Sequence, residues 1–341
     1  MRRILSFLIV FAAVLFLCVL MCGCPQKESG DADTDLVIAS WNVQNIFDAV
    51  ENGTEYSEFL PSSGWNEKMY AARVSNAVTV LGYDRLADAD IIVLNEVEND
   101  KVVEDILNSP VMKKRNLSWY VTAGEPGAAI KTAVISRMPI KSVRIHSVDG
   151  ARPVLQAEFE TAGERLFVLA VHAKSRLEGI EQTAPVRLET GKVLKTVAAS
   201  LERDFSGCLV VIAGDFNEDY RDTNMMCDTR TSAGKSTNVP LLLTDRPAYG
   251  FWYCMWVDGK KSLWPEGSYN YGGQWFCFDN ILISGAGGNK SGWELEDAGV
   301  VMTGIIRSSD NKPEAYNRQK LSGVSDHLPV WVSFSLNPGV V

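Results

Sequence analysis

The sequence predicts an α/β fold, because short apolar runs typical of buried strands are interleaved with two stretches of helical periodicity. No internal repeat or low-complexity block interrupts this pattern after residue 35. A chain of 341 residues could hold one large α/β domain or two small ones. The polar motifs described below extend from residue 41 to residue 329, and independent domains would scatter them. We therefore expect one domain, at residues 36–336.

Seven apolar runs predict the strands. In chain order they are residues 36–41, 91–94, 132–136, 166–171, 209–213, 278–283 and 328–334. Two further stretches carry apolar residues three and four positions apart, as one face of an amphipathic helix does. They are residues 67–81, with Tyr70, Val74, Ala77, Val78 and Leu81 on one face, and residues 185–201, with Val186, Val193, Leu194, Val197 and Leu201.

Composition and charge exclude several classes of protein. With 46% hydrophobic and 22% charged residues, the chain does not have the composition of a disordered, collagen-like or disulfide-dense protein. The formal net charge of −9 argues against a protein that coats DNA, which would be basic. The chain is also long enough to bury a sizeable hydrophobic core. These properties favour an acidic globular protein.

The N-terminus has the pattern of an export signal. Two arginines precede an almost wholly apolar run at residues 4–21, and about 18 such residues suit either a signal peptide or a membrane-spanning helix. Gly23 before Cys24 resembles the cleavage motif of bacterial lipoproteins. We therefore predict a lipoprotein signal peptide at residues 1–23 and a lipid anchor on Cys24.

The segment after the signal supports the same interpretation. Residues 24–35 are polar and rich in turn formers, which predicts a flexible tether. The protein would be an exported, membrane-anchored lipoprotein that faces the periplasm or the exterior. An uncleaved anchor and plain secretion are the alternatives, and Cys22 is a poorer acylation site because Met21 precedes it.

Four cysteines follow the tether. Export permits disulfides among them, but four cysteines allow three pairings, and the sequence does not choose between these. None belongs to a C-x-x-C pair, which argues against a zinc ribbon. The four are Cys208, Cys227, Cys254 and Cys277.

Nearly every predicted strand is followed or preceded by a compact group of polar residues. The groups are residues 42–45, 95–98, 172–175, 214–217, 279–280 and 325–327. Strand ends that meet at one edge of a sheet are where α/β folds build their sites. We therefore expect these polar side chains to come together in one functional site.

The residue types in these groups indicate the chemistry of the site. Glu96, Asp215 and Asp326 offer carboxylate oxygens, and two asparagines add amide oxygens, a donor set that suits Mg²⁺ or Mn²⁺ rather than zinc. Of the three histidines, His172 and His327 lie in the groups. Imidazoles beside metal-bound carboxylates can stabilise the charge that develops on a phosphate. The combination is typical of enzymes that cleave phosphoesters.

Five of the motifs resemble those of the endonuclease/exonuclease/phosphatase superfamily, the deoxyribonuclease-I-like proteins, and they occur in the same order. They are W-N-V-Q-N-I-F-D at 41–48, N-E-V-E at 95–98, V-H-A-K-S at 171–175, G-D-F-N at 214–217 and S-D-H-L-P at 325–329. Each motif alone is weak, but five in order across most of the chain are specific. The resemblance implies a four-layer α/β sandwich, in which helices flank two packed, mostly antiparallel sheets.

The resemblance also implies which residues bind the metal and activate water. Glu96 would be the principal metal ligand, with Asn42 and Asp326 near the metal. The cofactor would be Mg²⁺, with Mn²⁺ or Ca²⁺ as alternatives. Asp215 would orient or deprotonate the attacking water, and Asn217 would hold the phosphate.

The resemblance also implies roles for two histidines, an aspartate and two arginines. His172 and His327 would hydrogen-bond the phosphate oxygens or serve the leaving group. Asp279 would orient His327, as a carboxylate that fixes an imidazole tautomer does. Arg137 and Arg152 are similar to basic positions in nuclease members of the family.

The leading hypothesis is therefore a metal-dependent phosphodiesterase, an extracytoplasmic nuclease that hydrolyses DNA or RNA. A sphingomyelinase- or phospholipase-C-like enzyme and an inositol-phosphate phosphatase are alternatives. A non-catalytic surface-binding lipoprotein is a further alternative, although such a protein need not keep the full set of polar residues. The partners would be nucleic acid and, through the lipid on Cys24, a membrane, and no obligate protein partner is evident.

Overall fold

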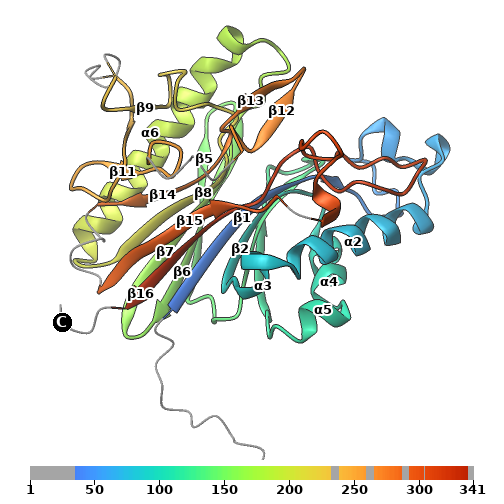
Figure 1. The fold of residues 1–341 in the computed structure, drawn as a ribbon, viewed down its shortest axis with the longest axis horizontal. Helices are drawn as coiled ribbons and strands as arrows, with labels where there is room; N and C mark the ends of the chain where they lie inside the picture. The colour runs from blue at the N-terminus through green and yellow to red at the C-terminus, as the bar shows by residue number, and fades with distance from the viewer. Residues whose placement is uncertain (1–34, 232–237, 259–264, 286–291, 303, 337–341) are drawn as a thin grey trace, which may run out of the picture. The chain divides into compact units, whose positions relative to one another are not determined.

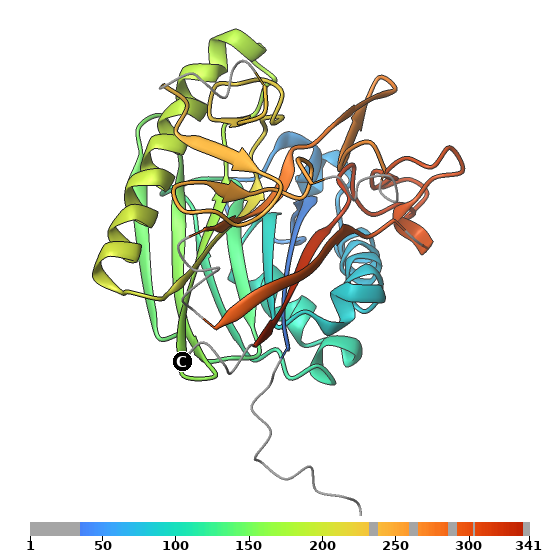
Figure 2. The ribbon, with the colours of Figure 1, turned by 60° about the vertical axis from the view of Figure 1, so that its left-hand side comes forward.

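Two β-sheets form the centre of the fold, and helices lie against their outer faces (Figure 1 and Figure 2). The computed structural model describes residues 35–336 without 232–237, 259–264, 286–291 and 303. The predicted signal peptide, the lipidated Cys24 and the tether up to residue 34 lie outside the described residues. None of the helices in the described part combines the length and the apolar composition that crossing a membrane requires.

Within the described residues, the first sheet has six strands and the second has eight. The order in the first sheet is β15 (Trp293–Val300), β16 (Val330–Leu336), β1 (Asp35–Ile46), β2 (Ile91–Val97), β4 (Lys131–Ser136) and β3 (Trp119–Ala123). The order in the second sheet is β5 (Ser142–Val148), β6 (Ala151–Thr161), β7 (Glu164–His172), β8 (Leu209–Asp215), β14 (Asp279–Ser284), β11 (Trp252–Tyr253), β10 (Leu241–Thr244) and β9 (Met226–Asp228). Most neighbouring strands are antiparallel, but β1 runs parallel to β2, β7 runs parallel to β8, and β10 runs parallel to both β9 and β11.

Helices cover the outer face of each sheet. The helices α2 (Glu67–Leu81), α3 (Asp84–Asp88), α4 (Asp100–Leu107) and α5 (Pro110–Lys113) lie on the side of the first sheet. The long helix α6 (Ile180–Asp204) lies along the second sheet, on the opposite side of the sandwich (Figure 2). A separate hairpin, β12 (Tyr269–Tyr271) and β13 (Gln274–Phe276), projects beside the ends of the sheets (Figure 1).

The side chains of β1 show how the layers are held together. Leu36 and Ile38 are buried in the core between the two sheets, together with residues of β7, β8 and β14. Val37, Ala39 and Trp41, which point to the other face of the strand, are buried in a second core with α2 and α4. A strand that is apolar on both faces must be covered on both sides. The predicted four-layer sandwich is therefore confirmed.

The sequence located the buried elements well and their ends less well. The helix predicted at 67–81 has those bounds, whereas α6 begins at Ile180, five residues before the expected start at Pro185. Pro185 therefore lies inside the helix rather than at its start. All seven predicted strands are present, and the four cysteines after the tether are buried.

Candidate active site

The polar groups meet at one edge of the sandwich, because the strands that carry them end or begin there. Register places His172 beside Asp215 on the neighbouring parallel strand. It also places Asp215 opposite Asp279, at the start of the antiparallel strand β14. In the first sheet, Asn42 lies beside Asn95 in the same way. The register of the two sheets therefore gathers much of the predicted site.

Glu96 enters the site through a bulge in β2. Asn95 and Val97 occupy successive ladder positions opposite β4, so Glu96 is an extra residue between them. Its φ of 69° lies in the left-handed region, which costs a residue other than glycine about 1–3 kcal/mol. A bulge changes the direction of a side chain, and here the Glu96 carboxylate meets the side chain of Asn42. The backbone is therefore strained at the predicted metal ligand.

Asn42 joins the carboxylates of the two sheets. Its Nδ2 donates to Glu96 Oε1 at 2.9 Å and to Asp215 Oδ2 at 3.0 Å. Its Oδ1 accepts from the backbone N–H of Gln44 at 2.9 Å. The amide nitrogen, rather than the oxygen, therefore faces the site, and the role of Asn42 as a metal ligand stays a prediction.

Asn95 is a second connection between the sheets, and no individual role was predicted for it. Its Nδ2 donates to the carbonyl of Val171, next to His172, at 3.1 Å. Its Oδ1 accepts from the backbone N–H of Asp215 at 2.9 Å. The fully buried side chain thus fixes β2 against the ends of β7 and β8. The one signal available in the sequence was its place directly before Glu96 in the motif.

Asp215 lies buried at the centre of the site and accepts hydrogen bonds on both oxygens. Asn217 donates to it from the backbone N–H at 2.8 Å and from Nδ2 at 3.1 Å. Together with Asn42, these donors orient the carboxylate without neutralising it. Asn217 Nδ2 also donates to the carbonyl of Ala173, which follows His172, at 3.3 Å.

His327 and Asp279 form a buried pair. His327 Nδ1 lies 2.7 Å from Asp279 Oδ2, so the predicted orienting contact is present. The backbone N–H of Asp279 donates to Ser268 Oγ at 3.0 Å, and the ring of Tyr269 lies 4.6 Å from that of His327. Ser268 and Tyr269 therefore lie beside this pair, in addition to the residues that were predicted for the site.

The two histidines differ in protonation. Burial lowers the pKa of His172 well below its usual value, and the charge of Arg152 adds to this. Burial also opposes the charge on His327, but Asp279 and Asp215 outweigh it and hold the pKa of His327 well above its usual value. Asp215 Oδ2 lies 3.7 Å from Nε2 of His172 and 4.0 Å from Nε2 of His327. At neutral pH, a neutral imidazole and a protonated imidazole therefore flank one carboxylate.

The electrostatics of the carboxylates fit a divalent cation. Burial raises the pKa of Glu96, and the negative charge of Asp326 raises it further. Burial also raises the pKa of Asp215, to about 7. Ligand atoms of Glu96, His172 and Asp215 all lie within 4.8 Å of one another. A hard cation bound beside these carboxylates would relieve the repulsion between them, and carboxylate oxygens suit Mg²⁺, Mn²⁺ or Ca²⁺.

The structure separates the two arginines that were similar to nuclease positions. Arg137 pairs with Asp90 at 3.0 Å, at the end of β2 opposite to Glu96. Arg152 lies near the site, where its charge lowers the pKa of both His172 and Glu96. Of the two arginines, Arg152 is the one that the structure places with the predicted site residues.

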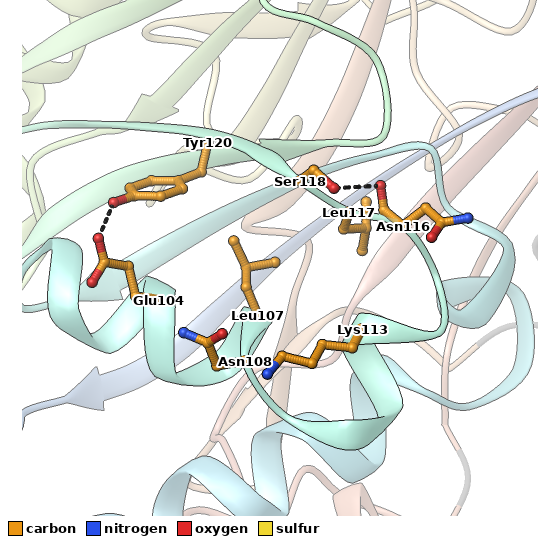
Figure 3. A pocket seen from close by; sticks show the side chains of 8 residues that line it. All are labelled: Glu104, Leu107, Asn108, Lys113, Asn116, Leu117, Ser118 and Tyr120. Atoms are coloured by element: carbon orange, nitrogen blue, oxygen red, sulfur yellow. Dashed lines mark hydrogen bonds between the residues drawn. The ribbon is translucent and has the colours of Figure 1, made fainter.

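Two pockets differ in their relation to this site. One, of about 710 Å³, is bordered by Arg152 and Lys174 and opens beside the end of β7. The other, of about 310 Å³, lies between α4, α5 and β3 (Figure 3). There Tyr120 Oη donates to Glu104 at 2.6 Å, and no residue of the predicted site lines the pocket. Of these two pockets, the first lies nearer to the candidate site, because Arg152 and Lys174 border it.

Comparisons with known proteins agree with this geometry. A model of the endonuclease/exonuclease/phosphatase family matches residues 37–335. A humanized D. rerio TDP2 carrying 14 mutations is similar in structure, with a TM-score of 0.57, 15% identity and coverage of 89% of this chain and 99% of that chain. D. rerio TDP2 complexed with single strand DNA product gives a TM-score of 0.55 at 16% identity, over 89% of this chain and 100% of that chain. A beta toxin structure from Staphylococcus aureus gives 0.56 at 15% identity, over 87% and 99%. No curated protein matches the sequence.

Proposed function

Because the chain belongs to the endonuclease/exonuclease/phosphatase family, we propose that it is a divalent-metal-dependent phosphodiesterase acting on DNA or RNA. One observation carries the proposal. A buried carboxylate, Asp215, is flanked by a neutral and a protonated imidazole beside the oxygen ligands of Glu96 and Asp326. Groups whose environments push their pKa values apart can divide the work of acid and base between them.

Each group has a role in an in-line hydrolysis. A divalent cation held by Glu96 and Asp326 would supply charge stabilisation at the phosphoryl oxygens. Asp215 accepts a proton from the attacking water, whose oxygen bonds to phosphorus as the bond to the leaving oxygen breaks. The protonated His327 donates from Nε2 to a phosphoryl or leaving oxygen, and His172 hydrogen-bonds the phosphate.

A nucleic acid substrate is supported from two directions. A structurally similar protein, D. rerio TDP2, has been solved with single strand DNA product. In this chain, Arg152 lines the pocket beside the site, where its guanidinium can contact a phosphate that flanks the reacting one. The net charge of −9 does not oppose this, because a bound cation reverses the local sign at the reacting phosphate.

The first prediction is that the purified full-length chain, kept in detergent, cleaves plasmid DNA or RNA in the presence of Mg²⁺. EDTA is expected to abolish the activity, because the cluster of carboxylates needs the cation to accept an anionic substrate. Gel electrophoresis of the products measures both effects, and added Mg²⁺ in excess of EDTA should restore cleavage. The matched control is His172→Ala, which should be inactive under the same conditions.

Parallel assays with sphingomyelin and inositol phosphates separate the other functions. Cleavage of lipid without cleavage of nucleic acid would replace the nuclease proposal by a phospholipase. Hydrolysis of none of these phosphoesters would favour a binding protein. Activity that survives EDTA would contradict the metal-dependent mechanism.

We also propose that the protein is exported and carries a lipid on Cys24. The basic and apolar start of the chain and Gly23 support this. Labelling with radioactive palmitate in a bacterial host is expected to mark the wild type but not Cys24→Ser. If Cys22→Ser loses the label instead, the lipid is attached to Cys22. If the wild type carries no label, the prediction of a lipoprotein is wrong.

A further inference from the structure

Arg73 is a fully buried cation behind the candidate site. It lies on α2, and its guanidinium donates to three backbone carbonyls. Nη2 donates to the carbonyls of Val43 and Gln44, the latter at 2.8 Å, and Nη1 donates to the carbonyl of Val324. The ring of Tyr316 covers the guanidinium, with Cζ 4.8 Å from the ring centroid.

These carbonyls belong to two segments that are far apart in the sequence. Val43 and Gln44 directly follow Asn42, which joins the carboxylates of the two sheets. Val324 precedes the S-D-H motif, in which the hydroxyl of Ser325 donates to the carbonyl of Asn42 at 2.7 Å. One side chain therefore holds together the segment that carries Asn42 and the segment that carries Asp326 and His327.

Arg73 differs from Arg187 in that none of the described carboxylates lies at hydrogen-bonding distance from it. Arg187, which is also fully buried, pairs with Glu218 at 2.8 Å. Among the described residues, no carboxylate forms an ion pair with Arg73, and a buried charge without such a pair costs several kcal/mol. Burial lowers the pKa of Arg73 to about 10, and the charges of Asp326 and Glu96 oppose this. The guanidinium therefore stays charged at neutral pH, and its positive charge interacts with the carboxylates of Asp326 and Glu96.

Arg115 provides a matched comparison in the same molecule. It donates to the carbonyls of Leu81, Leu86 and Ala89, and burial lowers its pKa to about 10 as well. Its charged neighbours are Arg137, Asp88 and Asp90, at the end of β2 opposite to Glu96. Two arginines thus share one type of contact, but only one of them lies behind the site.

We propose that Arg73 is a positioning residue of the active site, which aligns the Asn42 and Asp326–His327 segments and sets the charge behind Glu96. The inference rests on the proposed phosphodiesterase activity. Lysine in its place keeps a charge but cannot donate to three carbonyls in the planar geometry of a guanidinium. A displacement of about 1 Å at reacting groups can cost a hundredfold in rate.

The experiment compares Arg73→Lys with Arg115→Lys in the full-length chain. We expect both variants to lose stability to a similar extent in thermal unfolding. Arg73→Lys is expected to lower kcat by about tenfold to a hundredfold with little change in KM, because substrate contacts from the second sheet remain. Arg115→Lys is expected to keep the kcat of the wild type. Mn²⁺ binding, measured by calorimetry without substrate, should weaken in Arg73→Lys alone.

The outcomes separate this inference from the proposed function. A wild type that binds Mn²⁺ but cleaves no phosphodiester would contradict the function, while its Mn²⁺ affinity would still test Arg73. A folded Arg73→Lys variant with the kcat and Mn²⁺ affinity of the wild type would overturn the inference, as would an equal loss in Arg115→Lys. If Arg73→Lys does not fold, Tyr316→Leu replaces it in the experiment, because this substitution removes the ring that covers the guanidinium. We expect Tyr316→Leu to lower kcat in the same way. An unchanged kcat in this variant would overturn the inference.

Discussion

Replacing Asp215 with asparagine is expected to lower kcat by about 10²–10⁴-fold, the range that a positioned general base contributes. An amide cannot accept the proton of the attacking water. The substitution is close in shape, so the hydrogen bond from the backbone N–H of Asn217 to Oδ1 can remain. Steady-state kinetics with a phosphodiester substrate measures the effect, and circular dichroism checks the fold.

A buried aspartate four residues further along is the control for this prediction. Asp219 accepts from Arg221 and from the backbone N–H of Cys277 at 2.9 Å, and among the described residues it forms no hydrogen bond with the candidate site residues. Asp219→Asn is therefore expected to retain most of the wild-type kcat. If Asp215→Asn keeps more than a tenth of the activity, the base that activates water is another group.

Asp279→Asn is expected to lower kcat by about a hundredfold or more, by analogy with the loss when a carboxylate that orients a catalytic histidine is removed. The carboxylate lies 2.7 Å from His327 Nδ1, and after burial it is the largest influence on the pKa of that ring. Without it, fewer charges oppose the effect of burial, and the pKa of His327 falls. The protonated form is then lost at lower pH, so the alkaline limb of the kcat/KM profile moves to lower pH.

Ser268→Ala separates the charge of Asp279 from its placement. This variant removes the hydroxyl that accepts from the backbone N–H of Asp279 and leaves the carboxylate in the chain. We expect a smaller loss of kcat and an unchanged alkaline limb. If the limb also stays in place in Asp279→Asn, proton donation by His327 is not what the profile reports.

The apolar periodicity predicted the core of the fold but not its edges. The helix at 67–81 was predicted with its bounds, because Tyr70, Ala77 and Leu81 recur on one face. The structure adds that the side chain of Asn66 caps its first turn. Strand β6 was missed, because Pro153 and the buried Gln156 interrupt its apolar pattern. Gln156 is satisfied by the ring of His146 on β5, a pairing that appears only once the strands are in register.

The candidate site was predictable to the extent that each residue follows a strand. Those residues meet at one edge, but the direction of each side chain depends on backbone geometry that the sequence does not display. Two examples are the bulge at Glu96 and the orientation of Asn42, whose amide nitrogen faces the site and donates to Glu96. Arg73 is a third case, because a charged residue on a helix is ordinarily expected to face solvent. Here the side chain is buried and donates to three carbonyls, which belong to two segments far apart in the sequence.

The pairing of β1 with β16 joins the first described strand to the last one. One consequence concerns the point during synthesis at which the candidate site is completed. Asn42 emerges from the ribosome early, whereas His327 and the strand that follows it emerge much later. Until then, the nascent chain lacks part of the candidate site. For the same reason, proteolytic removal of residues 325–336 is expected to take Asp326 and His327 out of the candidate site.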